Sequence, residues 1–574
     1  MLQKREYLNE KLEKHILNFS RRIADSCKIK AVCICGDYAS GFCDKETVVE
    51  VLLVIHRFQP RLMSYVKTFD DRNILVFAVD DWVFERDVER GFLGEALAGR
   101  IIFPYVPLLN EEYLRFQEVK LKKRLIVELL ENLVLSFPEL SYEFRIKPEY
   151  FMYETMLNMT RVFPPLVYSL LNLMRKEVKK RNIELMAHGF SEALKELEKE
   201  GFIKFSNGYL RISEEFVEHA RSRKVSFINF FRTAQKTTQR TLFTTLLGVF
   251  PKVMNVFSQS KELFLKSRKN AEEELMLVRG LEDPQRFLYI PTARGLVPLA
   301  DRMDIESFVR KTLSAGEDVK FKIKRVGGVL NDVYLVEASS LNGEQKFIVK
   351  RFKNWSSFKW FPLALWTLGT RTFAVSGRSR LERECAINQF LHSRGYRVPR
   401  ILHVNHNERL VFMEYVEGKS LTDVIKSVAR TKRGRNAKQE LAIISEVGEK
   451  VAEVHALGIT LGDTKPENFM VKEREVYMMD FEQASRKGDK AWDIAEFLYY
   501  SGHYIPPFVG THPVKLIAES FIGGYLKAGG DVKAVKNAGK PKYTKVFSIF
   551  TFPHVILAIS NICGKSGKLE DKHG

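Results

Sequence analysis

A short polar segment in the C-terminal third constrains this chain more than any other feature. Leu461-Gly-Asp-Thr-Lys-Pro-Glu-Asn468 brings an aspartate, a lysine and an asparagine into one loop, and Met479-Asp-Phe-Glu482 follows closely. Isolated aspartates are common by chance, but an ordered set of this kind is not. The amphipathic spacing of Leu441–Leu457 predicts a helix that ends at Gly458. The fold must therefore place this polar loop directly after a helix.

These residue types match the groups that transfer of a phosphoryl group from ATP requires. A carboxylate aligns the acceptor hydroxyl, and an aspartate and an asparagine hold Mg²⁺ against the triphosphate. We expect Asp463 to orient the hydroxyl and accept its proton. Lys465 would neutralise the transferring phosphoryl group, whereas Asn468 and Asp480 would bind the metal. The sequence thus predicts two catalytic residues and two metal ligands.

Residues upstream of the loop supply groups that suit a nucleotide. The pattern of Lys322–Val336 predicts two strands joined by a turn at Gly327 and Gly328, where backbone N–H groups can approach phosphates closely. A predicted strand ends in Lys350, which would contact the α- and β-phosphates. An ordinary hairpin would show the same glycines, and a lone lysine is usually surface charge. The order of these residues relative to Asp463 nevertheless favours a nucleotide site.

Two further segments complete the predicted nucleotide site. Glu384 falls in a predicted helix over Arg380–Leu391 and would hold Lys350 as an ion pair. An apolar strand runs into a polar turn at Glu414 and Tyr415. This turn suits a hinge whose backbone pairs with adenine between two lobes.

The region from about residue 320 to residue 505 resembles the protein-kinase-like superfamily, above all its small atypical members. Arg383-Glu384, Met413-Glu-Tyr-Val-Glu-Gly418 and Gly462-Asp463 are similar to segments of RIO-type kinases and of the kinase subunit of the KEOPS tRNA-modification complex. Lys465-Pro-Glu-Asn468 instead resembles the corresponding motif of ordinary protein kinases. The resemblance covers roughly a third of the chain. It implies a bilobal kinase-like domain that uses ATP and Mg²⁺.

Departures from the family pattern concern the phosphate acceptor more than the donor. Leu461 stands where the family has a histidine, and Asn331 falls where a third glycine is usual. Glu482 replaces the glycine of Asp-Phe-Gly, a form similar to that of aminoglycoside and sugar kinases. The stretch from Asp480 to Asp493 is too short for a phosphorylatable activation loop. Asp493 itself could brace the catalytic loop, cap its own helix or do both. The acceptor could therefore be a protein, a small molecule or water.

Short β-branched runs near the N-terminus predict an α/β unit. Ala31–Cys35, Val48–Ile55 and Ile74–Val79 are each bounded by turn or charged residues, which is typical of strands. The segment Gly36-Asp-Tyr-Ala-Ser-Gly41 and the strand with Glu50 resemble the minimal nucleotidyltransferase pattern. That pattern is Gly-Ser-x-x-x-Gly, followed by Ser-Asp-x-Asp before an apolar strand.

The match to the nucleotidyltransferase pattern is incomplete. Asp37 replaces its serine, Val48 replaces its first carboxylate, and Glu50 stands at the second. A two-metal site needs closely paired carboxylates, which a valine cannot supply. The resemblance therefore implies a catalytically inactive domain kept for binding or scaffolding. An ordinary α/β domain without this ancestry is the alternative.

The middle of the chain is predicted to be mainly helical. Ser191–Gly201 predicts a helix with a glycine stop, and Phe202–Ile212 predicts a hairpin around Ser-Asn-Gly. A helix followed by a small hairpin is typical of a winged helix, although other elements share the pattern. Residues 220–318 are basic and mostly helical in pattern. The tryptophan-rich segment Trp355–Val375 suits docking of a partner, a membrane interface, or packing against the neighbouring region.

A chain of 574 residues is too long for one hydrophobic core. We predict a multidomain α+β protein in four parts. They are a degenerate nucleotidyltransferase-like α/β domain (1–110), a helical region with the winged-helix-like element (111–220), a basic connector (221–318), and a bilobal protein-kinase-like domain with C-terminal helices (319–574).

Composition narrows the setting in which this chain works. Apolar residues make up 45% and charged residues 28%, as in folded soluble proteins, and no apolar run is long enough for a membrane span. The N-terminal segment lacks a signal-peptide core, so we expect a cytoplasmic protein. Six cysteines without a CxxC pair favour buried structural thiols over disulfides or zinc. The net charge of +20 favours an acidic partner, such as RNA or a ribonucleoprotein.

Three functions remain open from the sequence. The leading hypothesis is an ATP- and Mg²⁺-dependent phosphotransferase, and within that class an atypical Ser/Thr protein kinase without an activation loop. Glu482 and the short spacing from Asp480 to Asp493 favour a small-molecule kinase instead. The basic charge, the winged-helix-like element and the degenerate nucleotidyltransferase pattern favour a nucleic-acid-associated scaffold switched by ATP.

Overall fold

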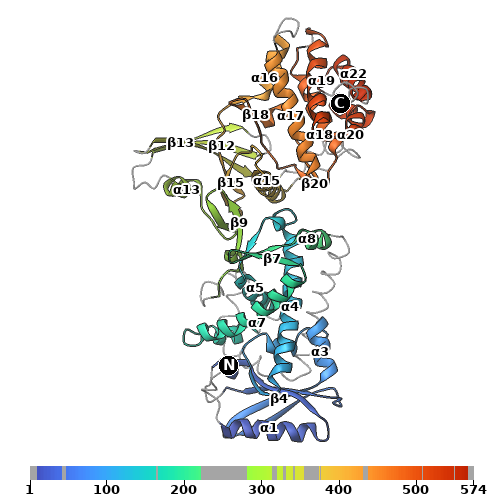
Figure 1. Ribbon diagram of the computed structural model, residues 1–574. Helices are drawn as coiled ribbons and strands as arrows, with labels where there is room; N and C mark the ends of the chain where they lie inside the picture. The colour runs from blue at the N-terminus through green and yellow to red at the C-terminus, as the bar shows by residue number, and fades with distance from the viewer. Residues whose placement is uncertain are drawn as a thin grey trace. The chain divides into compact units, whose positions relative to one another are not determined.

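The computed structural model describes most of the chain. The described residues are 10–41, 47–162, 166–221, 281–312, 320–327, 331–340, 343–354, 374, 376–430, 437–506, 509–548 and 550–566. The chain divides into two compact units, Met1–Tyr289 and Ile290–Gly574 (Figure 1). Gly328, most of the predicted basic connector and nearly all of the tryptophan-rich segment lie outside the described residues. No helix within the described ranges is long and apolar enough to cross a lipid bilayer.

The first unit is built on a mixed five-stranded sheet. Its strands lie in the order β3 (Leu62–Phe69), β4 (Arg72–Asp80), β2 (Val49–Ile55), β1 (Ile29–Cys35) and β5 (Val106–Leu109). β2 and β4 run parallel, and the other pairs are antiparallel. The three predicted strands correspond to β1, β2 and β4. The edge strand β3 has only partly buried and exposed residues, so its sequence lacks the continuous apolar run that marks the inner strands.

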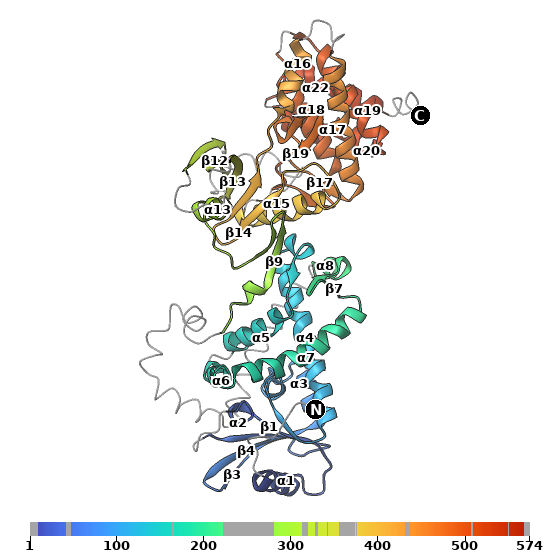
Figure 2. The ribbon, with the colours of Figure 1, turned by 60° about the vertical axis from the view of Figure 1, so that its left-hand side comes forward.

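Helices cover both faces of this sheet. α1 (Glu10–Ala24) packs on one face, and α3 (Asp81–Arg90) and α4 (Glu111–Ser136) cover the other (Figure 2). Successive strand residues point to opposite faces, so Cys33 and Cys35 both face the α3–α4 side. Both thiols are fully buried in the hydrophobic core.

Among the described residues, the rest of the first unit is mainly helical. Its helices are α5 (Glu149–Val162), α6 (Leu166–Leu173), α7 (Lys179–Lys199) and α8 (Glu214–Ala220). Strands β7 (Ile203–Ser206) and β8 (Tyr209–Ile212) form the predicted hairpin. Asn207 and Gly208 have φ values of 51° and 79°, as a tight hairpin turn requires. The predicted helix and hairpin are therefore confirmed, and their identity as a winged helix stays a prediction.

The connector was predicted to be mostly helical, but its described end also contains two strands. Residues 281–312 contain strands β9 (Leu288–Thr292) and β10 (Gly295–Pro298) and the helix α13 (Ile305–Thr312). The aromatic and β-branched residues of these two strands flank a turn, where Gly295 has a φ of 113°. The ring of Phe308 on α13 contacts Phe347 edge-on and Phe412 in a tilted arrangement, and both belong to the sheet that follows.

An antiparallel five-stranded sheet forms one part of the second unit. Its strands lie in the order β11 (Lys320–Gly327), β12 (Asn331–Ser340), β13 (Gly343–Phe352), β15 (Leu410–Glu414) and β14 (Ile401–Asn405). α15 (Gly377–His392) packs against this sheet (Figure 1). The strands and the helix predicted for this region are confirmed.

Helices form the other part of the second unit. They are α16 (Leu421–Arg430), α17 (Lys438–Ala456), α18 (Lys490–His503), α19 (His512–Lys527), α20 (Val532–Ala538), α21 (Pro541–Phe547) and α22 (Pro553–Lys565). Short strands lie on either side of the loop 461–468: β17 (Ile459–Thr460), β18 (Phe469–Lys472), β19 (Glu475–Met478) and β20 (Ser485–Arg486). α17 and α19 approach closely because Gly524 leaves room for the carbonyl oxygen of Ser445. A sheet part and a helical part thus give the predicted bilobal arrangement.

Candidate active site

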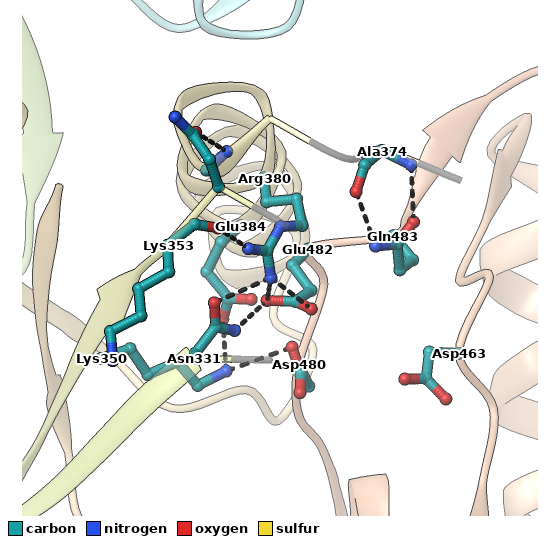
Figure 3. A network of polar contacts seen from close by, with 12 residues as sticks. Asn331, Lys350, Lys353, Ala374, Arg380, Glu384, Asp463, Asp480, Glu482 and Gln483 are labelled. Carbon is teal, nitrogen blue, oxygen red and sulfur yellow. Dashed lines mark hydrogen bonds and ion pairs between the residues drawn. The ribbon is translucent and has the colours of Figure 1, made fainter. Parts of the chain in front are cut away.

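Lys350 lies at the centre of a buried ion-pair cluster. β13 presents its side chain from the sheet, and α15 presents Glu384. Lys350 Nζ lies 3.5 Å from Glu384 Oε1 and 3.3 Å from Asp480 Oδ1 (Figure 3). Only 11% of the lysine side chain is exposed, and the Glu384 side chain is fully buried. The structure therefore brings together three predicted site residues from three separate segments.

The charges of this cluster control its protonation. Burial alone would lower the pKa of Lys350, but the carboxylates of Asp480 and Glu384 outweigh it and raise that pKa above its ordinary value. Burial raises the pKa of Glu384 to about 7 against the opposing effect of Lys350. Lys350 consequently stays a cation at neutral pH, as a contact with phosphate requires.

The backbone at Asp480 is held in the left-handed region, with a φ of 63°. This conformation is costly for a residue other than glycine and persists only where the surroundings fix it. The N–H of the next residue, Phe481, donates to Glu384 Oε2 at 2.8 Å, and the Phe481 ring is buried in the core of the helical part. Glu384 therefore contacts both the lysine and the segment that carries the predicted metal ligand.

Asp463 and Lys465 form the second half of the site. Lys465 Nζ lies 3.0 Å from Asp463 Oδ1 and 5.3 Å from the ring centroid of Tyr500. Asn468 Nδ2 donates to the main-chain oxygen of Asp463 at 2.8 Å. Burial would lower the pKa of Lys465, but Asp463 and Glu496 raise it above its ordinary value. The loop thus joins the predicted base, the predicted phosphate-neutralising lysine and one predicted metal ligand.

Asp493 braces this loop from α18. Its carboxylate accepts the N–H groups of Leu461 at 2.7 Å and Gly462 at 2.8 Å, and lies 3.0 Å from Nε2 of His455. The cap of α18 is Asp489, whose side chain accepts from the first turn of the helix. The bracing role of Asp493 is therefore confirmed, and the capping role is wrong, because Asp493 lies inside the helix.

The predicted metal ligand Asp480 suits a hard cation. Oδ1 of Asp480 is shielded from solvent, and apart from its contact with Lys350 it accepts no well-aligned hydrogen bond within the described residues. Buried carboxylate oxygens are normally satisfied, so this one has capacity for a ligand. No group of three or more His, Cys, Asp or Glu side chains converges in the described part of the chain. Mg²⁺ often needs only one or two carboxylates, because substrate phosphates and water complete its shell.

The remaining predicted nucleotide contacts lie at strand ends. Gly327 ends β11 and faces open space, whereas Gly328 lies outside the described residues. Glu414 ends β15, and its Oε2 accepts from Nε of Arg400 at 3.0 Å. Tyr415 follows it and is 36% exposed. The contribution of this turn to adenine binding stays a prediction that depends on its backbone.

Several supporting residues escape prediction from the sequence. Arg380 lies one helical turn before Glu384 on α15, a spacing that places both on one face and could have indicated it. Glu496 accepts the N–H of Thr464 at 2.9 Å. His455, at the end of α17, contacts the carboxylate of Asp493. No local pattern marks these two, since their partners are distant in the sequence.

In the first unit, the carboxylate of the nucleotidyltransferase-like pattern is already paired. Arg100 Nη1 donates to Glu50 Oε2, and both residues are largely buried. Asp37 accepts from Asn172 Nδ2 at 3.3 Å. A guanidinium group thus contacts the carboxylate that a metal would need. The relation of this unit to nucleotidyltransferases stays a prediction.

Comparison with known proteins gives two similarities. Residues 335–498 match the lipopolysaccharide kinase (Kdo/WaaP) family. A stretch of 104 residues is 29% identical to the KEOPS complex subunit Bud32 of Pyrococcus abyssi (strain GE5 / Orsay). The stretch covers 18% of this chain and 44% of that protein. The chain therefore spans less than half the length of this relative. Both similarities identify a kinase-like domain in the C-terminal region, as the sequence motifs predict.

Proposed function

We propose that the kinase-like domain transfers the γ-phosphoryl group of ATP to an acceptor hydroxyl with the help of Mg²⁺. The observation that carries this proposal is the burial of Lys350 between Glu384 and Asp480. A lysine kept cationic in this way suits the phosphates of a bound nucleotide. The similarities to the Kdo/WaaP family and to Bud32 support the same class of reaction.

The catalytic loop supplies the groups that act on the acceptor. Asp463 would orient the hydroxyl and accept its proton during transfer. Lys465, whose Nζ lies 3.0 Å from Asp463 Oδ1, would neutralise the transferring group. Asn468 and Asp480 would hold the metal, whose charge offsets that of the phosphates. Asp493 keeps the loop in place through its two backbone contacts.

For the acceptor we favour a Ser or Thr hydroxyl of a protein. Lys465-Pro-Glu-Asn468 is spelled as in ordinary protein kinases, which supports this choice. A small-molecule hydroxyl is the second candidate. It is favoured by Glu482, which is buried where protein kinases have glycine, and by the short connection between Asp480 and α18.

Transfer of label from γ-labelled ATP tests the reaction. The full chain and its Asp463→Asn variant are incubated with Mg²⁺, and Asp423→Asn, an exposed aspartate on α16, serves as the control. Label on protein supports a protein kinase, label on an added aminoglycoside or sugar supports a small-molecule kinase, and free phosphate alone supports an ATP-driven switch. If the wild type neither transfers label nor turns over ATP, the proposal fails.

Recruitment by RNA or a ribonucleoprotein is a separate proposal, supported by the net charge of +20. Lysine and arginine contacts with phosphates weaken steeply as salt rises. A gel shift with RNA at low salt that disappears at high salt would support it. The absence of any shift at low salt would remove it.

A further inference from the structure

Glu482 occupies the position of the usual glycine after the metal-binding aspartate, and its side chain belongs to a buried polar network. Asn331 Nδ2 donates to Glu482 Oε2. Arg380 Nη1 donates to Asn331 Oδ1 at 2.7 Å and lies 3.2 Å from Glu482 Oε1 (Figure 3). The exposed fractions are 0% for Arg380, 3% for Glu482 and 7% for Asn331. The three residues come from α15, from the segment after β19 and from the first position of β12.

Three further contacts surround this network. Gln483 exchanges two hydrogen bonds with the backbone of Ala374, at 3.0 Å and 3.2 Å. Nη2 of Arg380 donates to the carbonyl oxygen of Lys353, which lies just beyond β13. Lys353 Nζ in turn lies 2.6 Å from Oδ2 of Asp332, the second residue of β12. The start of β12, the end of β13 and the segment after Asp480 are therefore joined through one arginine.

We propose that Arg380 and Glu482 are positioning residues that fix the phosphate-binding strand pair relative to the metal-binding segment, an inference that rests on the proposed function. Asn331 follows Gly327 and Gly328 in the sequence, and Glu482 closely follows Asp480. An anchor between them fixes the start of β12 relative to the segment that carries the predicted metal ligand. Many protein kinases order these parts by phosphorylation of an activation loop. Here a permanent buried anchor keeps them assembled.

A double variant with apolar residues in place of Arg380 and Glu482 distinguishes a positioning role from a purely stabilising one. Removal of one partner of a buried ion pair is strongly destabilising, because the other charge stays buried without compensation. Replacement of both partners by apolar residues of similar size often restores stability. In that double variant, however, Asn331 loses both of its side-chain partners. Stability should therefore recover while the position of β12 does not.

The test uses the full chain with Arg380→Met, Glu482→Leu, the double variant and the control Arg310→Met, which removes an exposed arginine of α13 whose partner Glu306 is exposed as well. Thermal unfolding is measured beside the Kd and KM for Mg·ATP and the kcat of transfer. We expect both single variants to lower Tm and the double variant to recover most of the loss. The Kd and KM for Mg·ATP of the double variant should stay raised about tenfold or more, because charge-assisted hydrogen bonds are lost. Arg310→Met should match the wild type.

Asn331→Ala provides a second arm that does not depend on recovery of the fold. It leaves the Arg380–Glu482 pair, so it should lower Tm less than either single charge variant and raise the KM for Mg·ATP about tenfold. Wild-type affinity for Mg·ATP in either the folded double variant or Asn331→Ala would overturn the inference and leave the proposed function standing. A wild-type chain that binds no Mg·ATP would instead overturn both.

Discussion

Nζ of Lys350 lies 3.3 Å from Oδ1 of Asp480, although one residue belongs to the sheet and the other to a segment of the helical part. Glu384 contacts both the lysine and the backbone next to Asp480. The two parts of the kinase-like domain therefore share one buried charge cluster. Substitution of Lys350 in this cluster should therefore lower the affinity for the nucleotide more than substitution of any other residue of the sheet.

Lys350→Met removes the cation and leaves two carboxylates facing each other. We expect the affinity for ATP to fall about tenfold to hundredfold, since hydrogen bonds to charged groups contribute about 1.5–3 kcal/mol each. Isothermal titration with Mg·ATP measures this change. Lys346→Met, on the same strand but exposed, should bind ATP as the wild type does. Equal affinity in the two variants would contradict the assignment of Lys350.

Removal of the metal should stop transfer without unfolding the domain. The ligand set has few carboxylates, so its Mg²⁺ should be held partly by the nucleotide and be removed readily by a chelator. We expect EDTA to abolish label transfer and excess Mg²⁺ to restore it. Asp480→Asn should need about tenfold more Mg²⁺ for half-maximal transfer, as expected for the loss of about 1.4 kcal/mol. An unchanged Mg²⁺ requirement would exclude Asp480 as a ligand.

Two adjacent glycines of α19 should respond oppositely to alanine. A Cβ atom at Gly524 would overlap the carbonyl oxygen of Ser445, whereas Gly523 has open space beside it. Gly524→Ala should lower the free energy of unfolding by about 1–3 kcal/mol, as overpacking does. Gly523→Ala should leave it unchanged or raise it by up to about 1 kcal/mol, because alanine is the better helix former. Denaturant titration compares the two, and similar losses would contradict the close packing of α17 and α19.

Stability should fall in mild acid because of His403 on β14. Burial lowers its pKa below the ordinary value of 6.5 against the opposing effect of Asp301, which lies 3.2 Å from Nε2. As pH falls below 6.5, the unfolded chain takes up a proton that the folded chain resists. The contribution is therefore fully present above pH 6.5 and is lost as pH falls towards the folded pKa. Tm measured from pH 7.5 to 5.5 should decline less steeply in His403→Gln than in the wild type, and equal slopes would contradict this.

The elements near the site were predictable because their signals are local. Periodicity and turn residues indicate the strands before and after Gly327, the helix with Glu384, and α17, all of which the structure contains. The pairing of Lys350 with Glu384 was predicted from the order of the motifs in the family that the chain resembles, and not from any local signal. The helix cap at Asp489 was missed because Asp493 has the same residue type and lies within one turn of it.

The buried anchor was not predictable from the sequence. Asn331, Arg380 and Glu482 belong to segments that are far apart, and each is typical of the surface when taken alone. Only the packing of α15 on the sheet brings Arg380 to the other two. The pairing of Glu50 with Arg100 in the first unit was hidden for the same reason.

The transfer activity of Asp463→Asn tests the central claim most directly. Asparagine keeps the shape of the side chain but cannot accept the proton of the acceptor hydroxyl. We predict that the variant binds Mg·ATP about as tightly as the wild type and transfers label about 10²- to 10⁴-fold more slowly. Transfer by Asp463→Asn at the rate of the wild type would contradict the account.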